Sequence, residues 1–118
     1  IAEPANQPLI FHCSAGKDRT AILAAIVLGM LGVVDEDIVG DYVLSAPHGE
    51  MVHQRMKSQP GYSEYVETRP EYVWRADPES MFLFLKTLKQ ESGSVQQFLK
   101  AHGIEFSLVD QLKELFLV

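Results

Sequence analysis

Cys13 and Arg19 are separated by five residues in a segment of small and polar side chains that includes Gly16. Backbone N–H groups in such a tight loop converge on one point, and a helix that begins directly after the loop adds its positive end. The planar guanidinium of Arg19 can bind two oxygens of one anion, which a lysine cannot do in the same way. We expect Gly16 to let the loop turn where a Cβ atom would clash. These features predict a binding site for a dianion such as a phosphoryl group.

The same surroundings would act on the sulfur of Cys13. N–H donors, a helix N-terminus and a guanidinium all favour a thiolate, so we expect the pKa of Cys13 to lie below the value of about 8.5 for a free cysteine. A thiolate beneath a phosphoryl group is a nucleophile for in-line displacement, which gives a cysteinyl-phosphate that water then hydrolyses. We expect the Thr20 hydroxyl to donate to the sulfur and His12 to brace the loop through backbone hydrogen bonds. The alternative is a cysteine that only fills a small apolar space.

A strand and a helix are expected to position this loop. Residues 9–11 form a short apolar run that is typical of a strand buried on both faces, as in a parallel sheet. A buried apolar helix should follow the loop and end at Gly32. One strand cannot form a sheet, so we expect its partner strands to lie upstream or on another chain. Residues 1–118 would then be the C-terminal part of a single domain.

The rest of the chain is predicted to be mostly helical. We expect Asp35 to cap a second helix that runs to about Ser45, with three residues at core-facing spacing: Ile38, Tyr42 and Val43. Pro47-His48-Gly49 should end this helix, and a weaker helix is expected over residues 50–58.

Three further sequence signals mark helix starts in the last third of the chain. Asp77-Pro78-Glu79 combines a cap, a proline at the first helical position and an acid in the first turn. Ser94 and Gln97 are spaced as a capping box for a short helix that ends at Gly103, and Ser107 opens the last helix. After Asp77, apolar residues repeat at helical spacing: Met81, Phe82, Leu85 and Leu88.

Residues 59–76 lack a clear period and contain prolines and glycine, so we expect irregular chain there with at most one helical turn. The histidines outside the loop show no metal-ligand spacing and are interpreted as surface or packing residues: His48, His53 and His102.

Composition and charge exclude several classes of protein. The chain of 118 residues is 47% hydrophobic, which favours a buried core over disorder. Its net charge of −6, with only 10 Lys and Arg, disfavours nucleic-acid binding or a polybasic membrane anchor. The longest uncharged run, residues 20–34, is shorter than the roughly 18 apolar residues that a membrane span needs, so no integral membrane segment is expected. A single cysteine fits a reducing compartment or a secreted protein without disulfides.

Residues 12–20, His-Cys-Ser-Ala-Gly-Lys-Asp-Arg-Thr, resemble the signature H-C-x-x-G-x-x-R-[ST] of the cysteine-dependent protein tyrosine phosphatase superfamily. The Gly-Lys-Asp-Arg form resembles the bacterial family of tyrosine-specific or dual protein and phosphoinositide phosphatases. The likeness continues more loosely through residues 32–45 and 93–99. Ala21 departs from the family pattern, which has glycine there, and is a residue that a helix favours.

This resemblance implies an α/β fold of the protein tyrosine phosphatase type, a central parallel sheet flanked by helices, to which this chain contributes mainly helices and one strand. It implies that Lys17 and Asp18 take part in recognising the substrate's charge and in acid catalysis. Asp18 can be the general acid only when it is protonated in the complex, a state that the substrate dianion favours and that Arg19 and Lys17 oppose.

The resemblance also gives a meaning to side chains outside the loop. The aromatic residues of residues 59–76 would either line a phenyl-phosphate pocket, as a covering segment in this family can, or pack locally: Tyr62, Tyr65, Tyr72 and Trp74. Three arginines are candidates for contacts with a phosphoinositide headgroup: Arg55, Arg69 and Arg75.

The predicted activity is hydrolysis of phosphate monoesters. Cys13 would be the nucleophile, Arg19 would bind the phosphoryl group, Asp18 would be the acid, and backbone N–H groups of residues 14–19, including Ser14 and Ala15, would bind its oxygens. Because loop dipoles and Arg19 would neutralise the charge, we expect no metal and no cofactor. Phosphotyrosine, phosphoserine or phosphothreonine, and phosphoinositides all remain candidate substrates.

Two other classes of function share part of this pattern. A rhodanese-type sulfurtransferase also places a cysteine between a strand and a helix, but Arg19 followed by Thr20 favours phosphate. A binding module could instead recognise phosphorylated partners without turning them over. Release of phosphate, release of sulfite from thiosulfate, and trapping of phosphocysteine separate the three.

Overall fold

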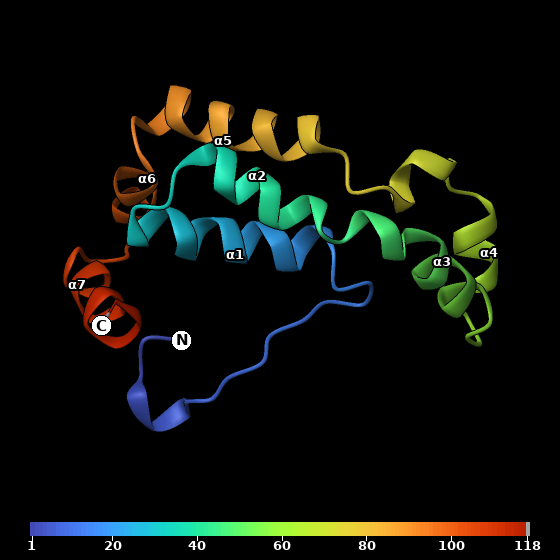
Figure 1. Cartoon of the computed structure of the whole chain (residues 1–118), viewed down its shortest axis with the longest axis horizontal. Helices are drawn as coiled ribbons and strands as arrows, with labels where there is room; N and C mark the ends of the chain where they lie inside the picture. Colours follow the sequence, from blue (N-terminus) through green and yellow to red (C-terminus); the bar gives the residue numbers. More distant parts are fainter. Residues whose placement is uncertain (118) are drawn as a thin grey trace.

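The computed structural model describes residues 1–117. Figure 1 shows α2 packed along α1 and α5, with α3 and α4 at one end of the molecule and α6 and α7 at the other. The seven α-helices of the described chain are α1 (Asp18–Leu31), α2 (Asp35–Val43), α3 (Gly49–Lys57), α4 (Ser63–Glu67), α5 (Pro78–Ser92), α6 (Val95–Ala101) and α7 (Ser107–Phe116). Short 3₁₀ helices are η1 (Pro4–Asn6), η2 (Ala46–His48) and η3 (Glu71–Trp74).

The core divides into clusters that follow this arrangement. The first joins α1, α2 and α5 and contains Ala25, Ile38, Tyr42, Ala76, Met81 and Leu85. The second lies where α1 and α5 meet α6 and α7 and contains Met30, Leu88, Val95, Val109 and Leu112. Of the residues expected in the core, Val43 is only half-buried and Phe82 is 50% exposed, because Phe82 lies next to Met81 on α5 and faces away from the first cluster.

A third cluster is separate from these two and joins α3, α4 and η3 through Met56, Val66 and Trp74. Of these elements, α3 and η3 approach each other closely, since a Cβ atom on Gly49, the first residue of α3, would lie 2.6 Å from the carbonyl oxygen of Trp74 in η3. Residues 59–76 thus contain a short helix, α4, and a 3₁₀ turn, η3, joined by turns and bends, so they are more helical than the irregular chain with at most one helical turn that the sequence predicts. The few apolar side chains of this segment follow no helical period, so only the packing against α3 reveals the helices.

Two predicted helix caps are confirmed. Asp77 accepts a hydrogen bond from the Glu79 N–H (3.0 Å), and Ser94 accepts one from the Gln97 N–H (3.1 Å). The prediction for Asp35 is wrong, because Val34 is the N-cap and Asp35 is the first helical residue. Asp35 instead pairs with Lys89 of α5, at 2.6 Å.

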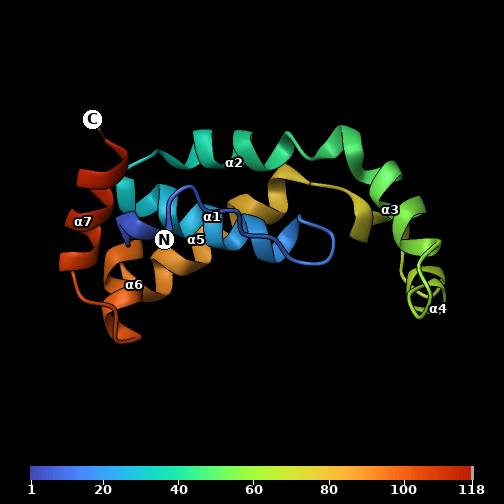
Figure 2. The ribbon, with the colours of Figure 1, turned by 90° about the horizontal axis from the view of Figure 1, so that it is seen from below.

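The strand predicted for residues 9–11 is absent from the described structure, where these residues form extended chain without regular structure. A strand needs a hydrogen-bonded partner, and residues 1–117 contain no strand that could provide one. The segment runs below α1 in Figure 1 and crosses in front of it in Figure 2, and Ile10 is 88% exposed. The predicted parallel sheet therefore stays a prediction.

The helix α1 is confirmed at its expected place, but it is less buried than predicted. Only Ala25 and Met30 are buried, whereas Ile22 and Leu23 are 40% and 37% exposed. The accessible surface of 8092 Å² also exceeds the roughly 6400 Å² expected for a compact monomer of this mass. Among residues 1–117, no helix combines the length and apolar character needed to cross a membrane.

Candidate active site

The loop before α1 bends at Gly16, which has a φ of +67°. This positive φ favours glycine, because other residues rarely adopt it. A Cβ atom at Gly16 would have no neighbour within 4 Å, so the clash expected from the sequence is wrong. Lys17 is the N-cap of α1, and its own side chain makes no capping hydrogen bond. The first N–H groups of α1 are therefore left for another acceptor at the loop.

Cys13 faces several donors at the start of α1. Burial alone would raise the pKa of its thiol, but hydrogen bonds from the Thr20 hydroxyl and from the backbone of Thr20, Gly16 and Lys17 outweigh burial and lower it to about 6. The Thr20 Oγ1 atom also accepts from the Cys13 N–H at 2.9 Å, so the Thr20 hydroxyl contacts both the backbone N–H and the sulfur of Cys13. At pH 7 the sulfur is mainly a thiolate.

His12 is exposed and lies outside the pocket described below. Its Nδ1 atom is 3.1 Å from the carbonyl oxygen of Cys13. The sequence predicts that His12 braces the loop through backbone hydrogen bonds, and this contact joins its ring to the backbone of the loop. The bracing role itself stays a prediction.

Lys17 and Asp18 form an ion pair beside the loop, with 2.8 Å between Nζ and Oδ1. The Lys17 ammonium also donates to the carbonyl oxygen of Arg75 at 2.8 Å, which ties the loop to the chain after η3. Asp18 accepts a second hydrogen bond on the same Oδ1 atom, from the hydroxyl of Tyr42 on α2 (3.1 Å).

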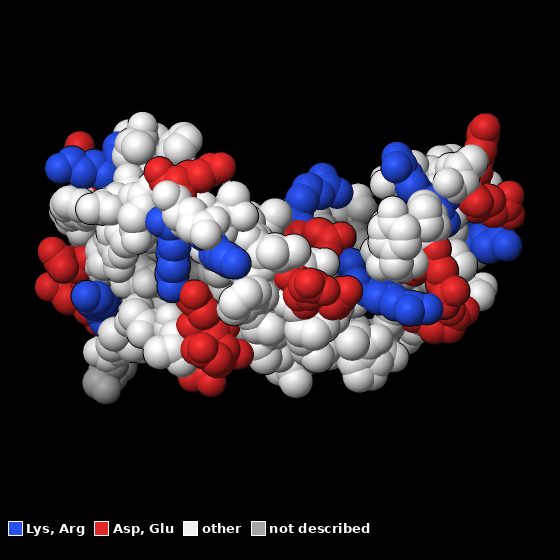
Figure 3. Space-filling model, turned by 90° about the horizontal axis from the view of Figure 1, so that it is seen from above, with Lys and Arg blue, Asp and Glu red and all other residues white. Residues whose placement is uncertain are grey.

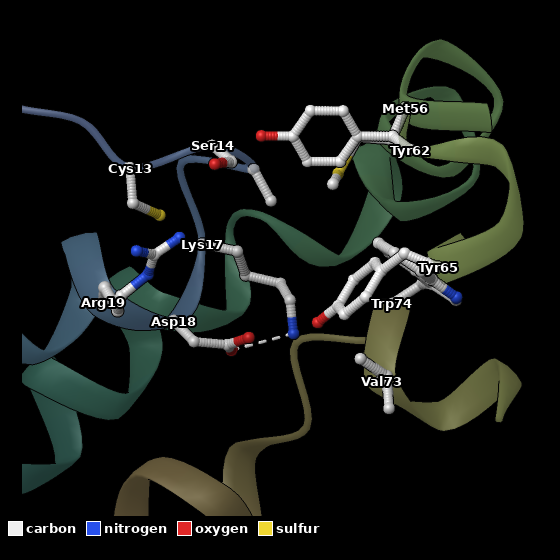
Figure 4. A pocket seen from close by; sticks show the side chains of 11 residues that line it. Cys13, Ser14, Lys17, Asp18, Arg19, Met56, Tyr62, Tyr65, Val73 and Trp74 are labelled. Atoms are coloured by element: carbon white, nitrogen blue, oxygen red, sulfur yellow. Dashed lines mark ion pairs between the residues drawn. The ribbon is translucent and has the colours of Figure 1, made fainter. Parts of the chain in front are cut away.

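A pocket of about 410 Å³ opens at this loop. Figure 4 shows its two parts, with Cys13, Arg19 and Asp18 on one side and aromatic and apolar side chains from α3, α4 and η3 on the other. The lining residues are Cys13, Ser14, Ala15, Lys17, Asp18, Arg19, Met56, Tyr62, Tyr65, Val73 and Trp74. The pocket therefore combines a nucleophile and a cation with an apolar wall.

The wall includes three of the four aromatic residues for which the sequence left two interpretations. Tyr62, Tyr65 and Trp74 line the pocket, and Trp74 also packs in the third core cluster. Tyr72 does not line it and is 70% exposed.

Two of the three arginine candidates contact side chains of residues 59–76, and Arg55, in the last turn of α3, is exposed. Arg75 pairs with Glu71 at 3.0 Å, and the Arg69 guanidinium lies 4.7 Å from the centre of the Tyr65 ring. On the face drawn in Figure 3, blue and red side chains are interspersed at the end of the molecule that carries α3 and α4.

The histidines outside the loop make packing contacts or line a minor cavity. The His53 ring lies 5.1 Å from the Trp74 ring, and His102 contacts the Phe98 carbonyl oxygen at 2.7 Å. His48 lines a smaller cavity of about 200 Å³ on the other side of the loop, together with Gly16.

The structure thus brings Cys13, Ser14, Ala15, Lys17, Asp18 and Arg19 to one pocket, with Thr20 beside the sulfur. Sequence reasoning did not include Met56 and Val73, whose apolar side chains carry no signal of a site. It interpreted Tyr42 only as a core residue and missed its contact with Asp18. The hydroxyl itself is the signal that could have revealed such a contact, because a buried tyrosine usually needs a hydrogen-bond partner.

One family model and several curated relatives match this chain. The family model described as "Tyrosine phosphatase family" matches residues 1–118. A "Tyrosine-protein phosphatase" of Nostoc commune is 30% identical over 122 residues, which cover 96% of this chain and 40% of the relative. "Triple specificity protein phosphatase PtpB" of Mycobacterium tuberculosis is 29% identical over 124 residues, which cover 96% of this chain and 45% of the relative. The chain therefore spans less than half the length of these curated relatives, and no solved structure matches it.

Proposed function

We propose a phosphatase mechanism from the premise that the chain belongs to the tyrosine phosphatase family. The full-length protein hydrolyses phosphate monoesters through a cysteinyl-phosphate. The observation that carries this proposal is the Cys13 thiol, whose pKa is lowered to about 6 in a pocket that it shares with Arg19. An ionised sulfur beside a guanidinium and helix N–H groups is suited to attack a bound dianion.

In the first step, the Cys13 sulfur forms a bond to phosphorus while the bond from phosphorus to the ester oxygen breaks. Arg19 and the N–H groups of residues 14–19 bind the phosphoryl oxygens, and Asp18 gives its proton to the leaving oxygen. In the second step, water attacks phosphorus, its proton passes to Asp18, and the S–P bond breaks. Inorganic phosphate leaves, and the Thr20 hydroxyl stabilises the returning thiolate.

Phosphotyrosine is the proposed substrate class. The pocket places Tyr62, Tyr65 and Trp74 opposite the loop, so a phenyl ring attached to the phosphoryl group would lie against aromatic side chains. Serine and threonine phosphates have no ring to bury there. The interspersed charges around α3 and α4 support a phosphorylated protein over a highly charged phosphoinositide headgroup.

The domain prediction also continues as a proposal. We propose that residues 1–118 form the C-terminal part of a phosphatase domain and that the strands of its sheet lie elsewhere in the protein or on another chain. The exposed apolar side chains of Ile10, Ile22 and Leu23 support it, because a sheet packed beside α1 would bury such side chains.

The test compares the full-length protein with its Cys13→Ser variant on a phosphotyrosine peptide and a matched phosphoserine peptide. We expect phosphate release from the tyrosine substrate, no turnover by Cys13→Ser, and retained binding of phosphate by that variant. Tyr62→Ala should raise KM for the phosphotyrosine peptide, whereas Tyr72→Ala, in the same segment but outside the pocket, should not. Turnover by Cys13→Ser would refute the covalent mechanism, and binding of phosphopeptides by the unmodified protein without turnover would indicate a binding module.

A further inference from the structure

Tyr42 packs in the core and also makes a hydrogen bond to a residue of the candidate site. The residue is 6% exposed, and its ring packs in the first core cluster between α1, α2 and α5. Its hydroxyl nevertheless reaches the Oδ1 atom of Asp18, 24 residues earlier in the sequence, at 3.1 Å. The ring is fixed by packing, so the position of the hydroxyl is fixed as well.

Among residues 1–117, the side-chain contacts of Asp18 fall on one of its two carboxylate oxygens. The Oδ1 atom accepts from the Tyr42 hydroxyl and from the Lys17 ammonium, and Lys17 is itself held by the Arg75 carbonyl oxygen. These contacts leave Oδ2 as the oxygen that can carry a proton. Asp18 lines the pocket that contains Cys13, and it also lines a cavity of about 140 Å³ together with Tyr42. The carboxyl group thus lies between the catalytic pocket and α2.

We propose that Tyr42 is a positioning residue that holds Oδ1 of Asp18 toward α2 and so presents Oδ2 to the oxygen of the leaving group. The proposal rests on the proposed function, in which Asp18 is the general acid. Tyr42 touches neither the substrate nor the reacting atoms, and it acts only through Asp18.

Burial, together with the charged groups that face this pair, keeps the Tyr42 hydroxyl protonated, so that it can donate a hydrogen bond. Burial is the main cause that raises the pKa of Tyr42 to about 12, and the carboxylates of Asp18 and of Asp77, the N-cap of α5, raise it further. Lys17, the N-cap of α1, is the cation on the other side of Asp18. The Tyr42 hydroxyl therefore remains protonated from acid to mildly alkaline pH.

The test uses Tyr42→Phe in the full-length protein with two substrates that differ in their need for an acid. Phenyl phosphate releases a basic phenolate that needs a proton, whereas 4-nitrophenyl phosphate releases a weaker base that leaves without one. We expect kcat/KM for phenyl phosphate, which reports only the first step, to fall roughly tenfold, a part of the 10²–10⁴ that general acids contribute, and kcat/KM for 4-nitrophenyl phosphate to change less than about twofold. The inhibition constant of inorganic phosphate should stay unchanged, since the loop and Arg19 are untouched.

The Asp18→Asn variant and a packing control complete the experiment. Asp18→Asn should show the same dependence on the leaving group, and adding Tyr42→Phe to it should cause no further loss. Ile38→Val trims the same core cluster one turn earlier on α2 and should leave the ratio of the two kcat/KM values unchanged. A melting temperature of Tyr42→Phe no lower than that of Ile38→Val shows that the fold is retained.

Three outcomes would overturn the proposal. They are an unchanged ratio of kcat/KM values in Tyr42→Phe, an equal loss of kcat/KM on both substrates, and an undiminished effect of Tyr42→Phe in the Asp18→Asn background. Absence of activity in the unmodified protein is a different result, since it would refute the proposed function itself.

Discussion

Replacing Thr20 by valine removes the hydroxyl that contacts both the N–H and the sulfur of Cys13, while it keeps the size and branching of the side chain. The pKa of Cys13 is lowered to about 6, against about 8.5 for a free cysteine. This difference corresponds to about 3 kcal/mol in favour of the thiolate, and the Thr20 hydroxyl shares the effect with three backbone groups.

We therefore expect Thr20→Val to raise the pKa of Cys13 by about one unit, or roughly 1.4 kcal/mol. At pH 7 the thiolate fraction would fall from about 90% to about 50%. The lowered pKa also sets the pH dependence of the proposed activity, because the reactive thiolate is lost as the pH falls through about 6.

The assay is the rate of alkylation of Cys13 by iodoacetamide as a function of pH, followed on the peptide that contains Cys13. The midpoint of this profile gives the pKa directly and does not depend on how nucleophilic each thiolate is. Thr20→Ser keeps the hydroxyl and is the matched control, with a midpoint close to that of the unmodified protein. The reasoning is refuted by a midpoint near 9 in the unmodified protein, or by the same midpoint in Thr20→Val.

Three further changes test separate parts of the structure. Arg19→Lys keeps the charge but loses the planar fork, so inhibition by inorganic phosphate should weaken at least about tenfold; an unchanged inhibition constant would contradict the role of Arg19. Gly49→Ala places a Cβ atom 2.6 Å from the Trp74 carbonyl oxygen and should cost about 1–3 kcal/mol in denaturant unfolding. Gly40→Ala, in open space within α2, is its control and should stabilise by about 0.5–1 kcal/mol, and equal effects of the two would refute the close approach. Asp77→Ala removes a cap and should cost about 0.5–2 kcal/mol, so an unchanged free energy of unfolding would contradict its contribution.

Local sequence chemistry predicted those features of the fold that depend on neighbouring residues. Asp77 and Ser94 each bond to an N–H group two or three residues later, so a few letters of sequence suffice to place these helix starts. The loop from Cys13 to Arg19 is likewise formed by consecutive residues, and its composition alone predicts an anion site at the start of α1.

Features that depend on distant residues could not be predicted in this way. Lys17 contacts the carbonyl oxygen of Arg75, 58 residues later, and nothing in the type or position of either residue indicates the other as its partner. The apolar wall of the pocket depends on the packing of Trp74 against Met56, which the irregular pattern of residues 59–76 conceals. The strand at residues 9–11 had a suitable composition, but a strand also requires a partner, and a single segment carries no information about one.

The most direct test of the central claim is to trap the intermediate. The full-length protein would be mixed with a phosphotyrosine peptide, quenched in acid within a single turnover, and digested for mass analysis of the peptide that contains Cys13. The mechanism predicts a phosphoryl group on the Cys13 sulfur that appears before free phosphate and is absent from Cys13→Ser. Release of phosphate at full rate, with Cys13 unmodified at every time point, would contradict it.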